Sequence, residues 1–316
     1  MKVGDAMLVR LALIYLALCL VGCNSGSAKT HDSSSAFQGS YPIHVVCTTG
    51  MVADLVRNIG GQHVRITQLM KAGVDPHLYK ASPGDISSLN EADLICYSGQ
   101  HLEGKMADLL HQLSHTRRSV AVTDGVDKEQ LLKNDDGIVD PHLWFDVSIW
   151  QQAAHRVLDE LCDYDPSHAA EYKKAASVYD AELQKLHQYA REQLATIDST
   201  RRVLVTAHDA FHYFGRAYQL EVKSIQGIST ESEASVKQVN DLVAFMVDRK
   251  IKAVFVESSV SEKNIKALVE GCASRGHKVD IGGELYSDAP GKDGTPDATY
   301  VGMVKHNVDT IVQALK

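Results

Sequence analysis

One stretch of this chain, residues 166–198, divides the sequence into two halves and limits the folds that it can adopt. The stretch contains no glycine and no strand-like run, and its Pro166 suits a first helical turn. Apolar side chains recur in it at steps of three and four residues, which predicts one amphipathic helix. At 1.5 Å per residue this helix would measure about 50 Å, longer than one small lobe needs. We therefore expect one long, rigid helix that spans both halves. Its apolar stripe consists of Tyr172, Ala176, Tyr179, Leu183, Leu186, Ala190, Leu194 and Ile197.

Short β-branched runs alternate with helical patterns on both sides of this helix. The pattern predicts strands at His44–Thr48, Val64–Leu69, Asp93–Tyr97, Ser119–Val122, Val203–Ala207, Val222–Gln226, Ala253–Glu257 and Lys278–Ile281. It predicts helices at Met51–Ile59, Gly84–Asn90, Glu103–Leu113, Val147–Leu161, Val236–Arg249, Glu262–Arg275 and Thr299–Leu315. Alternating strands and helices imply parallel sheets with helices on both faces. The expected fold class is α/β, with two lobes that each hold a roughly four-stranded parallel sheet.

The first 22 residues have the pattern of a lipoprotein signal peptide. Lys2 and Arg10 precede an apolar run of 11 residues, 11–21, which is too short to span a bilayer as a stable helix. The run ends in Leu-Val-Gly-Cys at residues 20–23, which resembles the lipobox of bacterial lipoproteins. That resemblance implies cleavage before Cys23 and lipidation of Cys23. Translation from Met1 or from Met7 would preserve the pattern.

The predicted domain organisation follows from these segments. Residues 23–41 are small and polar, so we expect a flexible tether rather than a folded segment. An N-terminal α/β lobe is expected at residues 42–165, the linker helix at 166–198, and a C-terminal α/β lobe at 199–316.

Charge and cysteine usage exclude some classes of function. The formal net charge is −8, and removal of residues 1–22 leaves 30 basic and 39 acidic side chains, a net charge of −9. This mild acidity argues against nucleic-acid binding and is compatible with attraction of cations. Four cysteines remain besides Cys19 and Cys23, and no CxxC spacing occurs, so cysteine ligation of a metal is not expected. We expect these four cysteines to be buried free thiols, with one disulfide between two of them as the alternative. They are Cys47, Cys96, Cys162 and Cys272.

Four motifs carry side chains that bind first-row metals. The tripeptide Asp-Pro-His occurs twice and presents His77 and His142; a Thr-Ala-His-Asp-Ala-Phe run presents His208, and a Tyr-Ser-Asp-Ala run presents Asp288. Ligands of parallel α/β sheets gather at the carboxyl ends of the strands. His77, His208 and Asp288 follow predicted strands, and His142 precedes a predicted helix. Three imidazoles and one carboxylate suit a divalent transition metal, so we expect these four to bind one ion between the lobes.

Five further residues are weaker candidates. Asp75 and Asp140 begin the two Asp-Pro-His motifs, and each either accepts a hydrogen bond from a ring N–H or forms the turn. His101 follows a predicted strand and is a possible fifth ligand. His212 is expected to support the site or to pack in the core, and Glu257 ends a predicted strand.

At these motifs the chain resembles the solute-binding proteins of ABC metal-ion importers, the cluster that includes TroA, PsaA and ZnuA. It is most similar to the TroA type. The resemblance extends from about Val45 to the end, and the combination of motifs carries it: Gly73–Tyr79, Asp140–Asp146, Val203–Phe214, Ser229–Ser235, Phe255–Ser259 and Gly282–Ala289. It implies two lobes joined by one rigid helix, with the metal held by His77, His142, His208 and Asp288.

The resemblance also implies partners and a location. The chain would be the capture component that delivers its ion to a membrane permease and, through it, to a cytoplasmic ATPase. It would be a monomer, lipid-anchored to the outer side of a bacterial membrane, in a periplasm or at a cell surface. No enzymatic activity is expected. Two alternatives remain, a zinc-dependent hydrolase, in which a metal would activate water, and a surface adhesin or interaction lipoprotein.

The sequence leaves the metal open between zinc, manganese and iron. Manganese-type members often carry Glu at the third ligand position, where this chain has His208. Zinc-importer members often carry a His-rich acidic loop before the second ligand, but residues 124–139 contain acids and no histidine. Zinc suits a tetrahedron of three imidazoles and one carboxylate, whereas a bidentate Asp288 would raise the coordination number and admit manganese.

Overall fold

The computed structural model describes residues 36–134 and 136–316. The predicted signal peptide, the lipidation at Cys23 and most of the predicted tether lie outside the described residues. The described part of the chain falls within one compact unit. The predicted lobe boundaries at residues 165 and 199 therefore stay predictions. Below, the first half is the part built on strands β1 to β4, and the second half is the part built on strands β5 to β8.

The first half is built on a four-stranded parallel sheet with the strand order β2-β1-β3-β4. The strands are β1 (Ile43–Cys47), β2 (Val64–Gln68), β3 (Leu94–Tyr97) and β4 (Ser119–Ala121). The helices that alternate with them are α2 (Gly50–Gly60), α3 (Pro83–Glu91) and α4 (Ala107–Ser114). A side-chain cap begins α2, because the Thr49 hydroxyl accepts from the Val52 N–H. The first half thus has the predicted parallel sheet.

Helix α4 begins four residues later than predicted, because the Glu103 side chain accepts hydrogen bonds in the loop after β3 instead of beginning the helix. The Glu103 side chain is buried and accepts hydrogen bonds from the Thr48 hydroxyl and from the backbone N–H groups of Ser98 and Gly99. These bonds fix the loop after β3 and leave only a short 3-10 turn, Gly104–Met106, before Ala107.

The second half also holds four parallel strands, but they form two hydrogen-bonded pairs, β5-β6 and β7-β8. The strands are β5 (Val203–Thr206), β6 (Glu221–Ser224), β7 (Ala253–Glu257) and β8 (Asp280–Leu285), and the helices are α7 (His212–Tyr218), α8 (Val236–Asp248), α9 (Lys263–Ser274) and α10 (Tyr300–Leu315). Where β5 ends beside β7, the N–H groups of Ala207 and His208 donate to the Glu257 side chain instead of to a strand carbonyl. A side chain therefore joins the two pairs at this edge.

Strand β8 extends four residues beyond its predicted end at Ile281. Two consecutive glycines, Gly282 and Gly283, follow the predicted end of the strand, yet both lie within β8. Gly283 has a φ of +148°, a conformation that favours glycine, next to a register shift in the β7-β8 pair. The extension carries the chain to the loop that bears Asp288.

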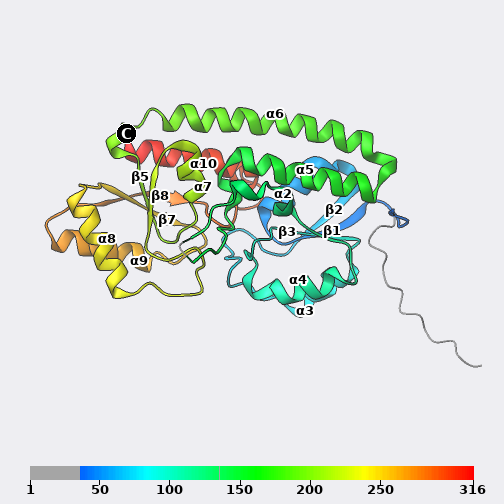
Figure 1. The fold of residues 1–316 in the computed structure, drawn as a ribbon, viewed down its shortest axis with the longest axis horizontal. Coiled ribbons are helices and arrows are strands. Elements are labelled where there is room, and N and C mark those ends of the chain that lie inside the picture. Colours follow the sequence, from blue (N-terminus) through cyan, green and yellow to red (C-terminus); the bar gives the residue numbers. More distant parts are fainter. Residues whose placement is uncertain (1–35, 135) are drawn as a thin grey trace, which may run out of the picture. The chain divides into compact units, whose positions relative to one another are not determined.

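One of two consecutive long helices, α6, runs along both halves (Figure 1). Helix α5 (Val147–Tyr164) is followed by a 3-10 turn at Pro166–His168 and by α6 (Ala169–Leu194), which runs along both halves in the figure. The predicted apolar stripe of α6 is buried from Tyr172 to Leu194 and belongs to one core cluster with residues of both halves. The predicted linker helix is thus confirmed, with α6 itself shorter than the range 166–198.

The last residues of the predicted tether are packed against the protein. The Phe37 ring lies 5.4 Å from the Tyr164 ring, and its N–H donates to the Tyr164 carbonyl. The Tyr41 hydroxyl donates to Asp165 at 2.8 Å. Phe37 and Tyr41 thus contact the folded part of the chain, and the extent of the predicted tether stays a prediction.

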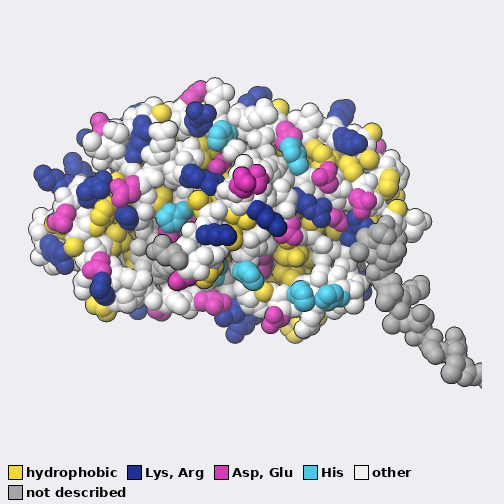
Figure 2. Space-filling view, in the orientation of Figure 1, with side chains coloured by type: hydrophobic (Ala, Val, Ile, Leu, Met, Phe, Trp, Pro, Cys, Tyr) yellow, Lys and Arg dark blue, Asp and Glu magenta, His cyan; other side chains and the backbone are white. Residues whose placement is uncertain are grey.

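Charged side chains of both signs lie on the surface, and the described cysteines are free. On the face drawn in Figure 2, acidic and basic side chains are interspersed over the surface. The four described cysteines are free, including the facing pair Cys47 and Cys96 on neighbouring strands. No described helix combines the length and the hydropathy that a membrane span requires.

Candidate metal centre

Four side chains from four separate loops meet between the two halves. His77 follows β2, His142 precedes α5, His208 follows β5 and Asp288 follows β8. All four are buried, and one ligand atom from each lies within 4.8 Å of the others. These are the four predicted ligands, although they are separated by up to 211 residues in sequence (288 − 77). The fold brings them together because the carboxyl ends of both sets of strands face the same junction.

The separations between these atoms have the dimensions of a metal site. The Nε2 atom of His142 lies 3.4 Å from that of His77 and 3.3 Å from that of His208. Asp288 places Oδ1 3.5 Å from His142 Nε2 and Oδ2 3.4 Å from His208 Nε2. A tetrahedral ion with metal–nitrogen bonds of about 2.0–2.1 Å requires ligand atoms about 3.3–3.4 Å apart. The four side chains therefore match one small divalent cation.

Two carboxylates hold the imidazoles in place from behind. Asp140 accepts from His142, with 2.7 Å between Oδ1 and Nδ1, and Glu257 accepts from His208, with 2.5 Å between Oε2 and Nδ1. Each bond occupies Nδ1 and leaves Nε2 directed at the other ligands. Carboxylates fix the tautomer and ring orientation of metal-binding histidines in this manner. Both were weaker sequence candidates, and the structure gives both this orienting contact.

Burial and charge act in opposite directions on the titration of the centre. Burial is the main cause that lowers the pKa of His77 to about 3. Burial also lowers the pKa of His142, but Asp140 and Asp288 outweigh it and the pKa is raised. For His208, Glu257 and Asp288 likewise outweigh burial and raise the pKa. Burial would raise the pKa of Asp288, yet the imidazoles, His208 foremost, hold it well below its usual range. Because imidazoles bind metals in their neutral form, the raised pKa values of His142 and His208 should weaken cation binding as the pH falls.

The other sequence candidates lie outside the set of four. Asp75 accepts from the backbone N–H of His77 at 2.9 Å and from the Thr230 hydroxyl at 2.5 Å. It forms the turn before His77 and links it to the second half. His101, with a φ of +63°, lines a separate pocket beside His111. His101 is therefore not a fifth member of the set.

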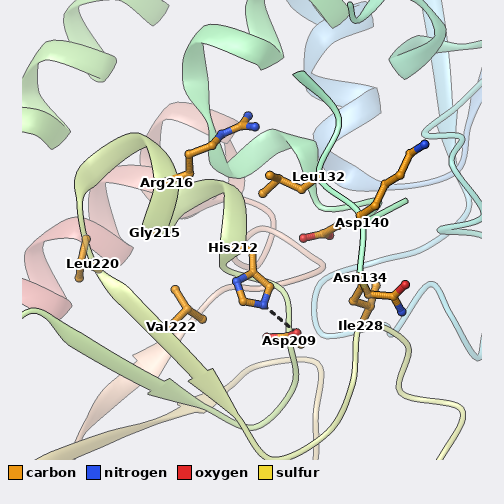
Figure 3. A pocket seen from close by; sticks show the side chains of 11 residues that line it. Leu132, Asn134, Asp140, Asp209, His212, Gly215, Arg216, Leu220, Val222 and Ile228 are labelled. Atoms are coloured by element: carbon orange, nitrogen blue, oxygen red, sulfur yellow. Dashed lines mark hydrogen bonds and ion pairs between the residues drawn. The ribbon is translucent and has the colours of Figure 1, made fainter. Parts of the chain in front are cut away.

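Another pocket is lined by His212 and by Asp140, the carboxylate behind His142 (Figure 3). His212 forms an ion pair with Asp209 at 2.8 Å and lines a pocket of about 580 Å³ with Asp140 and Arg216. None of the four clustered ligands lines this pocket. The pocket thus reaches the carboxylate that orients His142, and His212 lies beside the centre without joining it.

Sequence reasoning missed two contacts of Asp288 and its loop. The Ser259 hydroxyl donates to Asp288 Oδ2 at 3.1 Å, and the Trp144 indole donates to the Ser287 carbonyl at 3.0 Å. Ser259 ends the Phe-Val-Glu-Ser-Ser run, two residues after β7, so its motif was visible in the sequence but its contact with Asp288 was not. Trp144 follows the second Asp-Pro-His motif by two residues and ties the loops of His142 and Asp288 together.

The α/β fold and the buried set of three histidines and one aspartate define a metal-binding solute-binding protein. The chain belongs to the family described as zinc-uptake complex component A, periplasmic, whose model matches residues 45–314.

Two relatives show how similar proteins are described. The manganese-binding lipoprotein MntA of Bacillus subtilis is 46% identical over 307 residues, which cover 96% of this chain and 98% of MntA. The zinc-binding protein TroA of Treponema pallidum is 46% identical over 306 residues, 97% of this chain and 98% of TroA. The solved structure of the periplasmic TroA superposes with a TM-score of 0.85 at 48% identity, covering 88% of this chain and 99% of that one. Neither name describes an enzyme.

Proposed function

We propose that this protein captures one divalent transition-metal ion, zinc or manganese, with His77, His142, His208 and Asp288 as its ligands. The observation that carries the proposal is the convergence of three Nε2 atoms and one carboxylate, at 3.3–3.5 Å separations, in a buried position between the halves. The ligand set has no solvent-exposed member. A closed set of four protein ligands suits binding and transfer of an ion better than activation of water, which needs an open position.

We propose further that the ion is cargo for an ABC importer. Relatives of this chain are named as substrate-binding lipoproteins of metal ABC transporters, among them SloC of Streptococcus mutans, which is 31% identical over 323 residues. The inferred partners are a membrane permease and its cytoplasmic ATPase. The inferred location is outside the cytoplasm, with the lipid anchor at Cys23.

We propose zinc or manganese without choosing between them, because the two relatives that are 46% identical are named for different metals. Three imidazoles favour zinc, and raw affinity follows the Irving–Williams order, in which zinc exceeds manganese. Both oxygens of Asp288 face the imidazoles, so bidentate binding gives manganese a fifth ligand.

The test compares metal binding by the purified chain and by its His208→Ala variant. The chain is stripped with a chelator and titrated separately with zinc and manganese, and the bound metal is counted by elemental analysis. We expect one tightly bound ion in the unchanged protein and none of that class in the variant. His155→Ala is the control, since His155 is exposed and paired with Asp180 outside the centre. Undiminished tight binding in His208→Ala would overturn the ligand assignment.

Delivery is tested separately in vesicles that contain a metal-ion ABC permease and its ATPase from the same organism. ATP-driven uptake of the labelled ion should require the unchanged chain and should fail with His208→Ala. Uptake at the same rate without this chain would remove the importer role while leaving metal capture intact.

A further inference from the structure

A second group of metal-binding side chains lies where α6 begins. It consists of His63, which ends the 3-10 turn Gly61–His63 before β2, His168 at the N-cap of α6, and Glu171 in the first turn of α6. We call these three residues the His63 cluster. One ligand atom from each lies within 4.8 Å of the others, and none belongs to the centre between the halves. In Figure 1 this end of α6 lies beside β2.

The contacts within the cluster are close. His63 Nε2 lies 2.8 Å from Glu171 Oε2, and the two imidazole rings are stacked with their centroids 3.9 Å apart. His168 and Glu171 stand three residues apart, so that both project from the same side of the helix. Elements far apart in sequence thus present three donors at one point.

Asp165 orients His168 as Asp140 orients His142. Its Oδ2 lies 2.7 Å from His168 Nδ1, which leaves Nε2 of His168 as the free ring nitrogen. Asp165 is itself 1% exposed and is held by hydroxyl groups of Tyr41, Ser167 and Tyr172. A buried carboxylate behind an outward imidazole is the arrangement that supports metal-binding histidines.

Charge and exposure define the kind of ion. Glu171 and Asp165 contribute two negative charges to a cluster whose imidazoles bind metals in their neutral form. The exposed fractions of the side chains are 13% for His63, 25% for His168 and 59% for Glu171. A bound ion would therefore keep water at its remaining positions. Two imidazoles and one carboxylate suit zinc or copper better than magnesium or calcium.

We propose that His63, His168 and Glu171 form a second, solvent-accessible site for a divalent transition-metal ion of the zinc type. The ion takes the place of the proton that His63 Nε2 donates to Glu171, and the neutral ring then carries its proton on Nδ1. The site is weaker than the buried centre, because it has three protein ligands, it is open to water, and it adjoins the positive end of a helix dipole. This inference does not depend on the proposed import function.

The test is a zinc titration of the full chain by calorimetry after chelator treatment. We expect two classes of bound zinc, a tight one and a weaker one. His63→Gln and Glu171→Gln should each abolish the weaker class and leave the tight one. His111→Ala is the matched control, because His111 and His115 form another surface histidine pair, with ring centroids 4.9 Å apart. The control should retain both classes.

The outcomes separate this proposal from the previous one. A single class in the unchanged protein, or a weaker class that survives both His63→Gln and Glu171→Gln, would overturn the second site. Loss of the tight class in His208→Ala concerns only the buried centre. With copper as the probe, electron paramagnetic resonance of a variant in which His77, His142 and His208 are all replaced by Ala should show coupling to two imidazole nitrogens, and His168→Gln in addition should reduce it to one. An unchanged spectrum would contradict the assignment of His168.

Discussion

At the residue scale, the arrangement of the centre depends on carboxylates that lie behind its imidazoles. Glu257 is buried, and its two oxygens serve His208 in different ways. Oε1 accepts from the backbone N–H groups of Ala207 and His208, and Oε2 accepts from the His208 ring. One side chain thus fixes both the loop and the ring that it carries.

Substitution of Glu257 should therefore weaken metal binding without removal of a ligand. We expect Glu257→Gln to lower zinc affinity about 10–100-fold, because the amide no longer stabilises the ring N–H as a charged acceptor does. Competition with a chelator of known affinity measures the change. Glu262→Gln, an exposed glutamate paired with Lys266, serves as the control. Equal affinities in Glu257→Gln and the unchanged protein would show that this contact has no influence on the ion.

Asp165 makes a pH-dependent contribution to stability. Burial raises its pKa, but the hydrogen bonds from Tyr172, Ser167, Tyr41 and His168 outweigh burial and hold the pKa well below its usual range. A carboxylate with a depressed pKa in the folded state stabilises the fold above its unfolded pKa of about 3.9. This contribution is lost as the pH falls from there through the folded pKa.

The direction of the Asp165 pKa shift predicts how the stability changes with pH. In urea unfolding, the unchanged protein should exceed Asp165→Asn in free energy of unfolding at pH 7, and the difference should shrink as the pH falls below about 4. Equal differences at pH 7 and pH 3 would mean that hydrogen bonding at this position does not depend on the charge.

At the element scale, α6 is stabilised by its buried stripe. Leu183 is 0% exposed within the core, whereas Val178 on the same helix is 66% exposed. Helix propensity alone does not hold such a helix in place, so its packed face must supply most of the stability.

Two truncations on α6 test this difference. Leu183→Ala should lower the free energy of unfolding by about 2–5 kcal/mol, because it leaves a cavity in the core. Val178→Ala should change it by less than about 0.5 kcal/mol, as is usual for exposed positions. Chemical denaturation of both variants gives the comparison. A loss in Leu183→Ala no larger than that in Val178→Ala would show that packing of the buried stripe does not stabilise α6.

At the scale of the whole molecule, contacts tie the halves together even before an ion binds. The Tyr213 hydroxyl of α7 donates to the Asp140 carbonyl at 3.1 Å and accepts from the Leu132 N–H at 2.9 Å. The Tyr300 hydroxyl of α10 donates to the Trp144 carbonyl at 2.6 Å. These bonds bring the second half onto the loop that carries His142.

An ion that joins ligands from both halves should stabilise the whole fold. A ligand that binds only the folded state at 100 times its dissociation constant adds about 2.7 kcal/mol to the free energy of unfolding. We expect zinc to raise the denaturation midpoint accordingly in the unchanged protein. The same zinc concentration should leave His208→Ala without this gain. A zinc-independent midpoint in the unchanged protein would contradict binding between the halves.

The sequence by itself determined the elements and the candidate ligands, because periodicity and short motifs are local properties. The spacing of apolar side chains predicted α6, and the alternation of strands and helices predicted parallel sheets whose carboxyl ends bring ligands together. The same local reasoning failed where a distant contact decides the outcome. Helix α4 begins later than predicted because Glu103 bonds to Thr48 of another loop, and Phe37 docks because Tyr164 lies across from it.

Only the tertiary structure decided which charged side chains face one another. Asp75 and Asp140 begin identical motifs, and each accepts from the backbone N–H of its own histidine. Asp140 also bonds to the ring of His142, whereas Asp75 bonds to Thr230 instead. The His63 cluster has no motif at all, since His63 is 105 residues from His168 (168 − 63) and meets His168 and Glu171 only because α6 begins beside β2. Hydrogen bonds and metal ligation act over about 3 Å, and distances of that size are set by packing, which sequence spacing does not encode.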